Sequence, residues 1–360
     1  MTTTTTSAAF ANSLTAGKLP RFVPWVVLGA SVVIFLVGSV LLFLGGATDD
    51  VNWIGAIILG VLVFIVVNYV MALLVEGRRQ ATNRLVTSLV TAAFVLALIP
   101  LLWLLITVLQ NGLGTFLSPT FLGSSMRNVV GEGGGALHAI VGTLLITGIA
   151  ALLSIPVGLL TAIYLVEYGR GRLAQGITFF VDVMTGIPSI VAGLATYALF
   201  VILFGEGVKS GFAGSVSLSI LMIPVVVRSS EEILKLVPNE LREASYALGV
   251  PKWLTILKVV LPTSLAGITT GVMLAISRVI GETAPLLIVA GFTTSMNYNP
   301  FSERMMSLPV FVYNQYVSPG TQAEFYVERA WAGALTLILI VALLNVIARV
   351  VSHFFSPKLR

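Results

Sequence analysis

The sequence predicts an all-α integral membrane protein, a polytopic helical bundle with about eight transmembrane helices. Of its 360 residues, 57% are hydrophobic and only 10% are charged, whereas ordinary soluble domains have about 45–50% apolar and about 25% charged residues. The apolar residues stand in long uninterrupted runs, and a helix needs about 20 of them to cross the hydrocarbon core of a bilayer. The chain has no cysteine and only two histidines, which excludes disulfides, thiolate ligands and cysteine nucleophiles, so we expect no metal site.

Eight apolar runs bounded by charged residues, glycine and proline give the expected spans. They cover residues 23–45, 53–75, 85–110, 139–166, 176–204, 212–228, 263–291 and 330–352. The first run is longer than the 7–15 apolar residues of a cleavable signal peptide, so we interpret it as a retained span. Residues 1–22 before it begin with a threonine-rich stretch that has no periodic apolar face. We expect this stretch to be a disordered cytoplasmic tail.

The distribution of basic residues orients the spans. With the amino terminus inside, fifteen of the twenty lysines and arginines fall in inner segments. The outer segments hold four, and one more lies within a span: Arg127, Lys209, Arg304 and Arg329 outside, Arg278 within. The positive-inside rule therefore predicts a multi-pass membrane protein with both termini cytoplasmic. The same rule explains the net charge of +5 without a nucleic-acid partner.

The longest inner segment, residues 229–261, is punctuated like three short helices by Pro238, Gly249 and Pro251. Asn239 is a candidate N-cap for the middle helix, and Gly249 can end that helix in a left-handed conformation. The middle helix carries three small side chains that would let another protein approach its backbone closely: Ala244, Ser245 and Ala247. This surface is suited either to docking another protein or to folding back onto the chain's own spans.

Ionisable residues within the spans are functional candidates because burying them in a bilayer is costly. In the span expected at 263–291, Arg278 falls close to the membrane midplane and Glu282 follows one turn later, where the two can form an ion pair. Gly281 and Pro285 flank this pair, and a proline frees backbone polar groups that normally line a cavity. The pair therefore lines a path for an anion or joins two spans structurally.

Two further charges stand near the inner ends of their spans. Arg228 follows an apolar run and can reach the lipid headgroups by snorkelling. Asp182 precedes Pro188, and a packing or kink role is the more direct interpretation.

The segment from Glu243 to Pro262 resembles the EAA motif of the permeases of bacterial ABC importers, here Glu243-Ala244-Ser245, then Gly249, then Leu261-Pro262. Ser245 departs from the second alanine of that motif, and Val259 stands in place of isoleucine. The resemblance implies a type 1 importer transmembrane domain at about residues 139–350. It also implies that residues 229–261 include a coupling helix, with Glu243, Ala244, Ser245 and Gly249 at the contact with a separate ATP-hydrolysing subunit. The chain itself has no phosphate-binding loop of the G-x4-G-K-[ST] type.

Other stretches resemble the phosphate-importer permeases of that class. They are residues 133–145, 185–193, 223–230 and 275–286. The resemblance implies that Arg228, Arg278 and Glu282 matter for the movement of phosphate, whose oxygens a planar guanidinium can bind in pairs. It further implies three partners besides membrane lipid: a homologous second permease, a dimeric ATP-binding subunit and an extracytoplasmic phosphate-binding protein. No cofactor is expected on this chain, since ATP and magnesium would lie on the ATP-binding partner.

The chain departs from these permeases in its number of spans. They typically have six, which we expect within residues 81–360, whereas residues 23–80 supply two more. For this amino-terminal extension we expect a role in membrane anchoring or lateral packing.

Two outer segments carry weaker patterns. The glycine-rich run Gly131–Gly135 could bind an anion ahead of a helix, but a flexible loop is the simpler interpretation. Residues 292–328 are rich in phenylalanine and tyrosine, which suits the membrane interface or a seat for an external binding protein.

Three other functions remain open from sequence. The chain could be a permease for sulfate, molybdate or peptides, in which case the Arg278 and Glu282 side chains would be dispensable. An intramembrane enzyme would need paired catalytic groups, yet the spans hold only Asp182 and Glu282 as acids. An ion-coupled transporter would work without ATP, and the docking-like inner segment argues against it.

Overall fold

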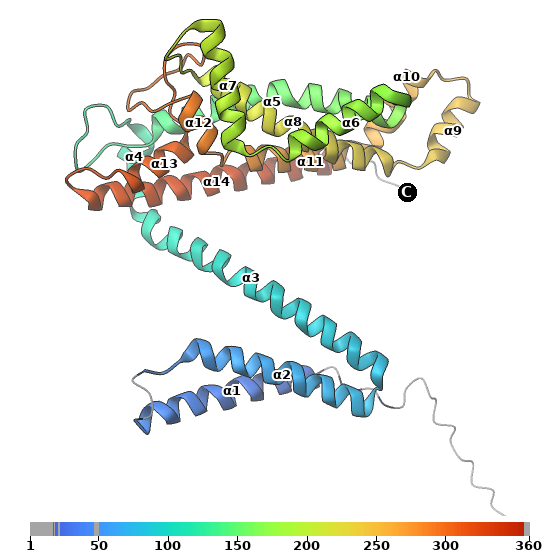
Figure 1. Cartoon of the computed structure of the whole chain (residues 1–360), viewed down its shortest axis with the longest axis vertical. Helices are drawn as coiled ribbons and strands as arrows, with labels where there is room; N and C mark the ends of the chain where they lie inside the picture. Colours follow the sequence, from blue (N-terminus) through green and yellow to red (C-terminus); the bar gives the residue numbers. More distant parts are fainter. Residues whose placement is uncertain (1–16, 18, 21, 47–49, 356–360) are drawn as a thin grey trace, which may run out of the picture. The chain divides into compact units, whose positions relative to one another are not determined.

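A computed structural model describes residues 17, 19–20, 22–46 and 50–355, and every regular element in this part of the chain is a helix. The predicted tail lies almost wholly outside the described residues, as do the side chains of Lys18, Arg21, Lys358 and Arg360. The helices are α1 (Val23–Leu44), α2 (Trp53–Val75), α3 (Arg78–Phe116), α4 (Pro119–Gly123), α5 (Leu137–Ile163), η1 (Tyr164–Tyr168), α6 (Gly171–Thr185), α7 (Ser189–Phe204), α8 (Gly211–Lys235), α9 (Asn239–Ala247), α10 (Lys252–Thr255), η2 (Ile256–Val260), α11 (Leu261–Val279), α12 (Ala284–Val289), α13 (Leu308–Val317) and α14 (Ala323–Phe355) (Figure 1).

Among the described residues, seven helical segments are long and apolar enough to span a membrane. Helices α6 and α7 would form an eighth span if taken together, although they are bent by 107°. The predicted all-α class with about eight spans is thus confirmed. The chain divides into two compact units, Met1–Leu105 and Ile106–Arg360, and the boundary lies within α3.

The first unit is a close-packed pair of helices followed by the beginning of α3. A Cβ atom at Gly60 of α2 would lie 2.8 Å from the Cα atom of Val32 in α1, so only glycine permits this approach. The end of α2 is tied to α3 by Glu76, whose carboxylate accepts two hydrogen bonds of 2.7 Å from Arg84. The pair of apolar helices predicted at residues 23–45 and 53–75 is confirmed within a residue at each end.

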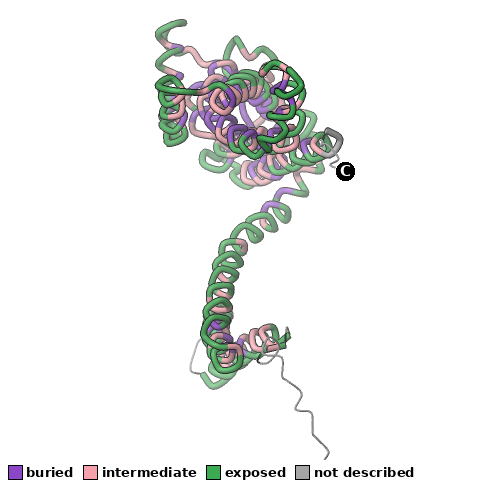
Figure 2. Tube along the Cα trace, turned by 90° about the vertical axis from the view of Figure 1, so that its right-hand side faces the viewer, coloured by how far each residue is buried: buried purple, intermediate pink, exposed green. Residues whose placement is uncertain are grey.

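The core of the second unit lies around α8. In its most apolar stretch, 67% of the residues are buried within the protein, against none in the corresponding stretch of α3. Helix α8 packs most extensively against α5, where a Cβ atom at Gly158 would lie 2.7 Å from the side chain of Val226. Figure 2 shows buried residues gathered inside this unit, while α3 is exposed over most of its length. An apolar helix exposed in this way is suited to contact with lipid.

The expected single span at residues 176–204 is wrong in shape. The chain leaves the helix between Thr185 and Ser189, and α6 and α7 run in different directions (Figure 1). Pro188 explains the break, because it has no N–H and disfavours a helical conformation in the residue before it.

The expected span at residues 263–291 is also wrong at both ends. It begins earlier, because α10, η2 and α11 form one continuous helix from Lys252 to Val279. It ends earlier too, because the chain leaves the helix at Ile280 and the short α12 starts only at Ala284. Apolar content alone cannot reveal such a break, since residues on both sides of it are equally apolar.

Candidate functional site

The inner segment 229–261 contains one separate helix rather than three. Residues up to Lys235 continue α8, and residues from Lys252 begin the long helix that ends at Val279. Only the middle helix, α9, stands alone. Its N-cap is Pro238, so the predicted capping by Asn239 is wrong. Gly249 has a φ of +76°, as predicted for a left-handed helix end.

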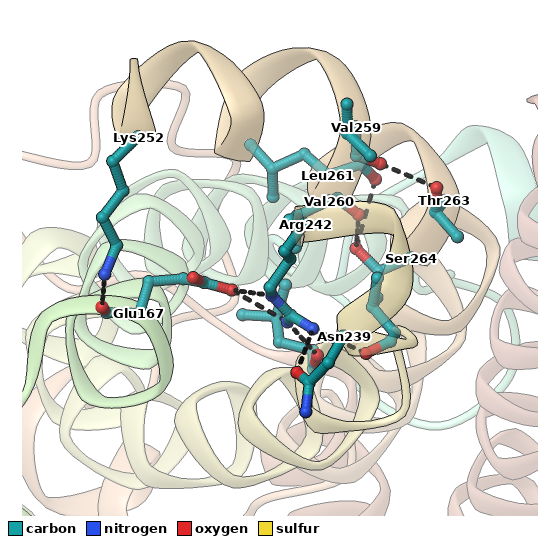
Figure 3. Close-up of polar contacts among 11 residues, drawn as sticks. Glu167, Asn239, Arg242, Lys252, Val259, Val260, Leu261, Thr263 and Ser264 are labelled. Carbon is teal, nitrogen blue, oxygen red and sulfur yellow. Dashed lines mark hydrogen bonds and ion pairs between the residues drawn. The ribbon is translucent and has the colours of Figure 1, made fainter. Parts of the chain in front are cut away.

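A buried ion pair anchors α9 to η1, the short helix that continues α5. Arg242 donates hydrogen bonds of 3.0 and 2.9 Å from Nε and Nη2 to the Oε1 atom of Glu167 (Figure 3). Their side chains are only 12% and 5% exposed. Arg242 also donates to the backbone oxygens of Val237 at 2.6 Å and Leu234 at 3.0 Å. These bonds satisfy the guanidinium, which would otherwise make burial costly.

A second link joins the same turn of helix to the start of α10. Lys252 donates a hydrogen bond to the backbone oxygen of Glu167 (Figure 3), and its ammonium lies 4.9 Å from the ring centroid of Tyr168. The interpretation from sequence missed both links. The available sequence feature was Glu167 itself, an acid at the inner end of a long apolar run.

The EAA-like residues of α9 divide into two groups. Glu243, Ala244 and Gly249 are exposed. Ser245 is buried, and its hydroxyl lies 2.8 Å from that of Thr255 in α10. The departure from alanine at this position therefore forms a hydrogen bond that links α9 to the long helix α10–α11.

Exposed apolar side chains surround α9. Leu248 is 84% exposed and Trp253 is 61% exposed, and both stand in the segment predicted to face the cytoplasm. Leu241 and Tyr246 add to the same region, which we call the α9 apolar patch (Leu241, Tyr246, Leu248 and Trp253). Exposed apolar side chains gathered in one short segment outside the lipid-facing spans are typical of a protein interaction surface.

Arg278 and Glu282 do not form the predicted ion pair. Arg278 lies in the last turn of α11, whereas Glu282 lies in the break beyond it, so the two do not share a helical face. The Arg278 side chain is exposed and has neither an ion pair nor a hydrogen bond with the described residues. Pro285 begins α12 and packs on α7, where a Cβ atom at Gly193 would lie 2.8 Å from the proline Cα atom. The helix break comprises Gly281 to Thr283, between the C-cap Ile280 of α11 and the start of α12 at Ala284.

Arg228 is held by carboxylates rather than left to snorkel. It forms ion pairs with Asp182 of α6 and, at 2.7 Å, with Glu231 on its own helix. Glu231 also pairs with Lys235 at 2.7 Å. The structure thus brings Asp182 and Arg228 together, which the sequence interpretation treated separately.

Helix α8 packs on α11 beside Arg228. Ser229 contacts Gly271 of α11, where an added Cβ atom would lie 2.6 Å from the serine hydroxyl. Arg278 follows Gly271 by two turns of helix, which is roughly 10 Å along α11. Its side chain is exposed.

The outer segments differ from their predicted arrangement. Arg329, expected in an outer loop, lies in α14, is only 3% exposed, and donates to the backbone oxygens of Gly131 and Gly133 at 2.7 and 2.8 Å. The glycine-rich run is thus bonded to this arginine through its carbonyl groups. The aromatic segment also divides, since Phe311 is fully buried while Tyr298 and Phe301 are about two-thirds exposed.

Residues 154–360 match the family described as binding-protein-dependent transport system inner membrane component. Over 285 residues the chain is 47% identical to phosphate transport system permease protein PstA 1 of Mycobacterium tuberculosis, covering 79% of this chain and 91% of the relative. It is 40% identical to the PstA protein of Pasteurella multocida over 285 residues, covering 78% of this chain and 96% of the relative.

A solved structure of the methionine ABC transporter MetNI in an inward-facing conformation is similar in fold. It superposes with a TM-score of 0.51 at 20% identity, covering 61% of this chain and 96% of the other. At this identity the similarity concerns the fold alone.

Proposed function

We propose which residues of this chain carry out phosphate transport, given that the chain belongs to the PstA family of phosphate transport permeases. It is the permease subunit of a phosphate ABC importer. It is a multi-pass membrane protein and a transport subunit rather than an enzyme, and it acts in a complex with other subunits. We assign a function to each of three structural features: the α9 apolar patch, the long helix α10–α11 and the helix break that follows it.

The α9 apolar patch is the docking surface for a separate, dimeric ATP-binding subunit. Its exposed leucines and aromatic residues, next to the EAA-like residues Glu243, Ala244 and Gly249, support this assignment. ATP and magnesium belong to that partner, and this chain holds no cofactor. A homologous second permease and an extracytoplasmic phosphate-binding protein complete the complex in the bacterial plasma membrane, with both termini of this chain cytoplasmic.

Movement of α9 reaches the transport path through continuous helix. The Ser245–Thr255 hydrogen bond ties α9 to α10, and the helix then runs without a break from Lys252 to Val279. Its 28 residues correspond to roughly 42 Å. Arg278 stands in its last turn, so a displacement of α9 is transmitted along one rigid element to this arginine. This connection is the observation that carries the proposal.

Arg278 attracts phosphate at the helix break. Its guanidinium offers planar paired donors and stays protonated, and in the described chain no carboxylate neutralises it. The break at Gly281–Thr283 also frees backbone polar groups, which suits a water-filled path. Glu282, within this break, can accept a hydrogen bond from the P–OH group of hydrogen phosphate.

Arg228 forms a second, weaker phosphate-binding site nearer the cytoplasm. Two carboxylates, Asp182 and Glu231, already compensate its charge, so an anion arriving there must compete with them. A compensated arginine favours release over tight binding, which suits the exit side of an importer.

The test uses the whole complex reconstituted in proteoliposomes, with labelled inorganic phosphate and ATP. Arg278→Gln should abolish uptake while the ATP hydrolysis rate stays within about twofold of wild type. Arg349→Gln, an exposed arginine of α14, is the charge-matched control and should retain uptake. Unchanged uptake with Arg278→Gln would remove Arg278 from the path.

A further inference from the structure

A cavity of about 770 Å³ lies at the opposite end of α8 from α9, on the side that the charge distribution predicts to be outer. It is open to one side and is lined by the end of α7, the loop that leads into α8, and the segment that follows α12. The volume falls within the range of about 300–1,000 Å³ that is usual for small-molecule sites. Neither the EAA-like segment nor the Arg278 region contributes to its lining.

Two basic side chains that line this cavity converge over Gly291, which precedes the lining residue Phe292. A Cβ atom at Gly291 would lie 3.0 Å from Cδ of Lys209 and 3.2 Å from Cγ of Arg304. Gly291 has a φ of +80°, so both the conformation and the space require glycine here. The absence of a side chain lets the aliphatic stems of the two cations meet from different loops.

Neither cation has a counter-ion among the described residues. Lys209 and Arg304 form no ion pair and no side-chain hydrogen bond with that part of the chain. The one acid in the lining, Glu303, leaves the lining with a net positive charge. Two like charges brought together without compensation repel each other, and an anion between them would remove that cost.

The walls of the cavity are largely aromatic. Phe212 lies 4.9 Å from Phe301 and 6.1 Å from Phe200 between ring centroids. An apolar wall on one side of the two cations lowers the local dielectric constant, which strengthens their attraction for an anion. The amino-terminal end of α8 beside the cavity adds positive potential.

We propose that this cavity is an entry site for a multiply charged oxyanion, held by Lys209 and Arg304 before it passes along α12 to Arg278. The inference rests on the proposed transport path and adds its outer end. Helix α12 has six residues, about 9 Å of helix, and separates Gly291 from the break that contains Glu282. An anion bound in the cavity is therefore separated by only one short helix from the helix break beside Arg278.

The role of the site is to retain phosphate that has entered the permease. Without the two cations, phosphate would escape outward during the cycle, and ATP would be hydrolysed without net import. The number of ATP molecules hydrolysed per phosphate imported is thus the quantity that the site controls.

The test uses the full complex in proteoliposomes with its binding protein and labelled inorganic phosphate at limiting concentration. The double variant Lys209→Gln/Arg304→Gln should reduce uptake about tenfold and raise the ratio of ATP hydrolysed to phosphate imported about tenfold. The swapped variant Lys209→Arg/Arg304→Lys keeps both charges and should import phosphate at close to the wild-type rate, which shows that the site folds. Arg127→Gln, an outer arginine that does not line the cavity, should leave uptake and the ratio unchanged.

Three results would overturn the proposal. Unchanged uptake and ratio in the double variant would remove the entry site alone. An equal fall of uptake and ATP hydrolysis would mean that the cavity receives the binding protein rather than the anion. A wild-type complex that imports no phosphate would overturn the transport path and the entry site together.

Discussion

Among single residues, Glu167 has the largest expected effect on the position of α9. Its carboxylate is the acidic partner of Arg242, and both side chains are almost fully buried. Removing one partner of a buried ion pair leaves the other uncompensated, which costs about 3–5 kcal/mol. Glu167→Gln should therefore lower the unfolding temperature of the purified complex and reduce phosphate-coupled ATP hydrolysis.

Two variants decide whether the ion pair is the cause. Glu240→Gln changes an exposed acid in the first turn of α9 and should leave both measurements unchanged. The double variant Glu167→Gln/Arg242→Met removes the uncompensated charge and should recover part of the stability. Equal unfolding temperatures for Glu167→Gln and wild type would contradict this account.

Ser245 tests a smaller interaction at the same scale. Its hydroxyl lies 2.8 Å from that of Thr255 in a buried position, and the Thr255 hydroxyl has only one further hydrogen bond among the described residues, of 3.4 Å to the backbone oxygen of Pro251. Weakening the pairing of a buried hydroxyl in this way costs about 1–3 kcal/mol. Ser245→Ala should destabilise the protein by that amount, whereas adding Thr255→Val should recover most of the loss because both polar groups are then absent. Denaturation of the four proteins of this cycle measures the coupling, and additive single effects would show that the hydrogen bond contributes nothing.

At the scale of elements, the α9 apolar patch carries a prediction about docking. Leu248 is 84% exposed and makes few contacts within the chain, so a polar residue there should not disturb the fold. Leu248→Glu would place a charge in the proposed interface and should reduce binding of the ATP-binding subunit at least tenfold. Co-purification and binding measurements with the isolated partner check this result.

The control for Leu248→Glu must change an exposed leucine outside the membrane spans, which excludes residues such as Leu74 of α2. Leu236→Glu is better, since Leu236 is 76% exposed just beyond α8 and lies outside the patch. It should bind the partner normally. Loss of binding in both variants would show that the effect is not specific to α9.

The elements that the sequence predicted best are those with sharp polar ends. The runs at residues 23–45 and 53–75 are bounded by Pro, Gly and charged residues, and the structure follows them closely. The breaks before Ser189 and Ala284 were harder, because the apolar character continues across them. The predicted Arg278–Glu282 pair failed for this reason, since it assumed that α11 continued as a helix.

Contacts between distant elements could not be predicted from local patterns. Arg242 and Glu167 are 75 residues apart, and nothing in either neighbourhood specifies the other. Arg228 and Asp182, 46 residues apart, were both noticed as charges, but their pairing depends on how α6 packs on α8. The EAA-like spacing was informative because its residues lie within one continuous stretch.

At the scale of the whole molecule, the amino-terminal unit can be tested by removal. Deleting residues 1–76 removes α1 and α2 together, an even number of spans, and therefore preserves the predicted orientation of the remaining helices. The second unit has its own core around α8, so the shortened chain should insert and import phosphate at near wild-type rates. Uptake per molecule of inserted protein measures this.

A control for that deletion removes only residues 1–46, and with them α1 alone. An odd number of spans is then lost, so the remaining chain should show misorientation or poor insertion in a cysteine-accessibility assay at introduced sites. A complete loss of uptake by the longer deletion, with normal insertion, would show that the first unit acts in transport rather than in anchoring.

The long sequence separation of the Glu167–Arg242 pair also has a consequence for biosynthesis. At about 5–20 residues per second, Glu167 leaves the ribosome about 4–15 s before its partner. During that interval α6, α7 and α8 are synthesised, while Glu167 waits for a partner that does not yet exist. The proposed docking surface is thus completed only after most of the permease has been made, so the ATP-binding subunit should join finished chains and pass over stalled or truncated ones.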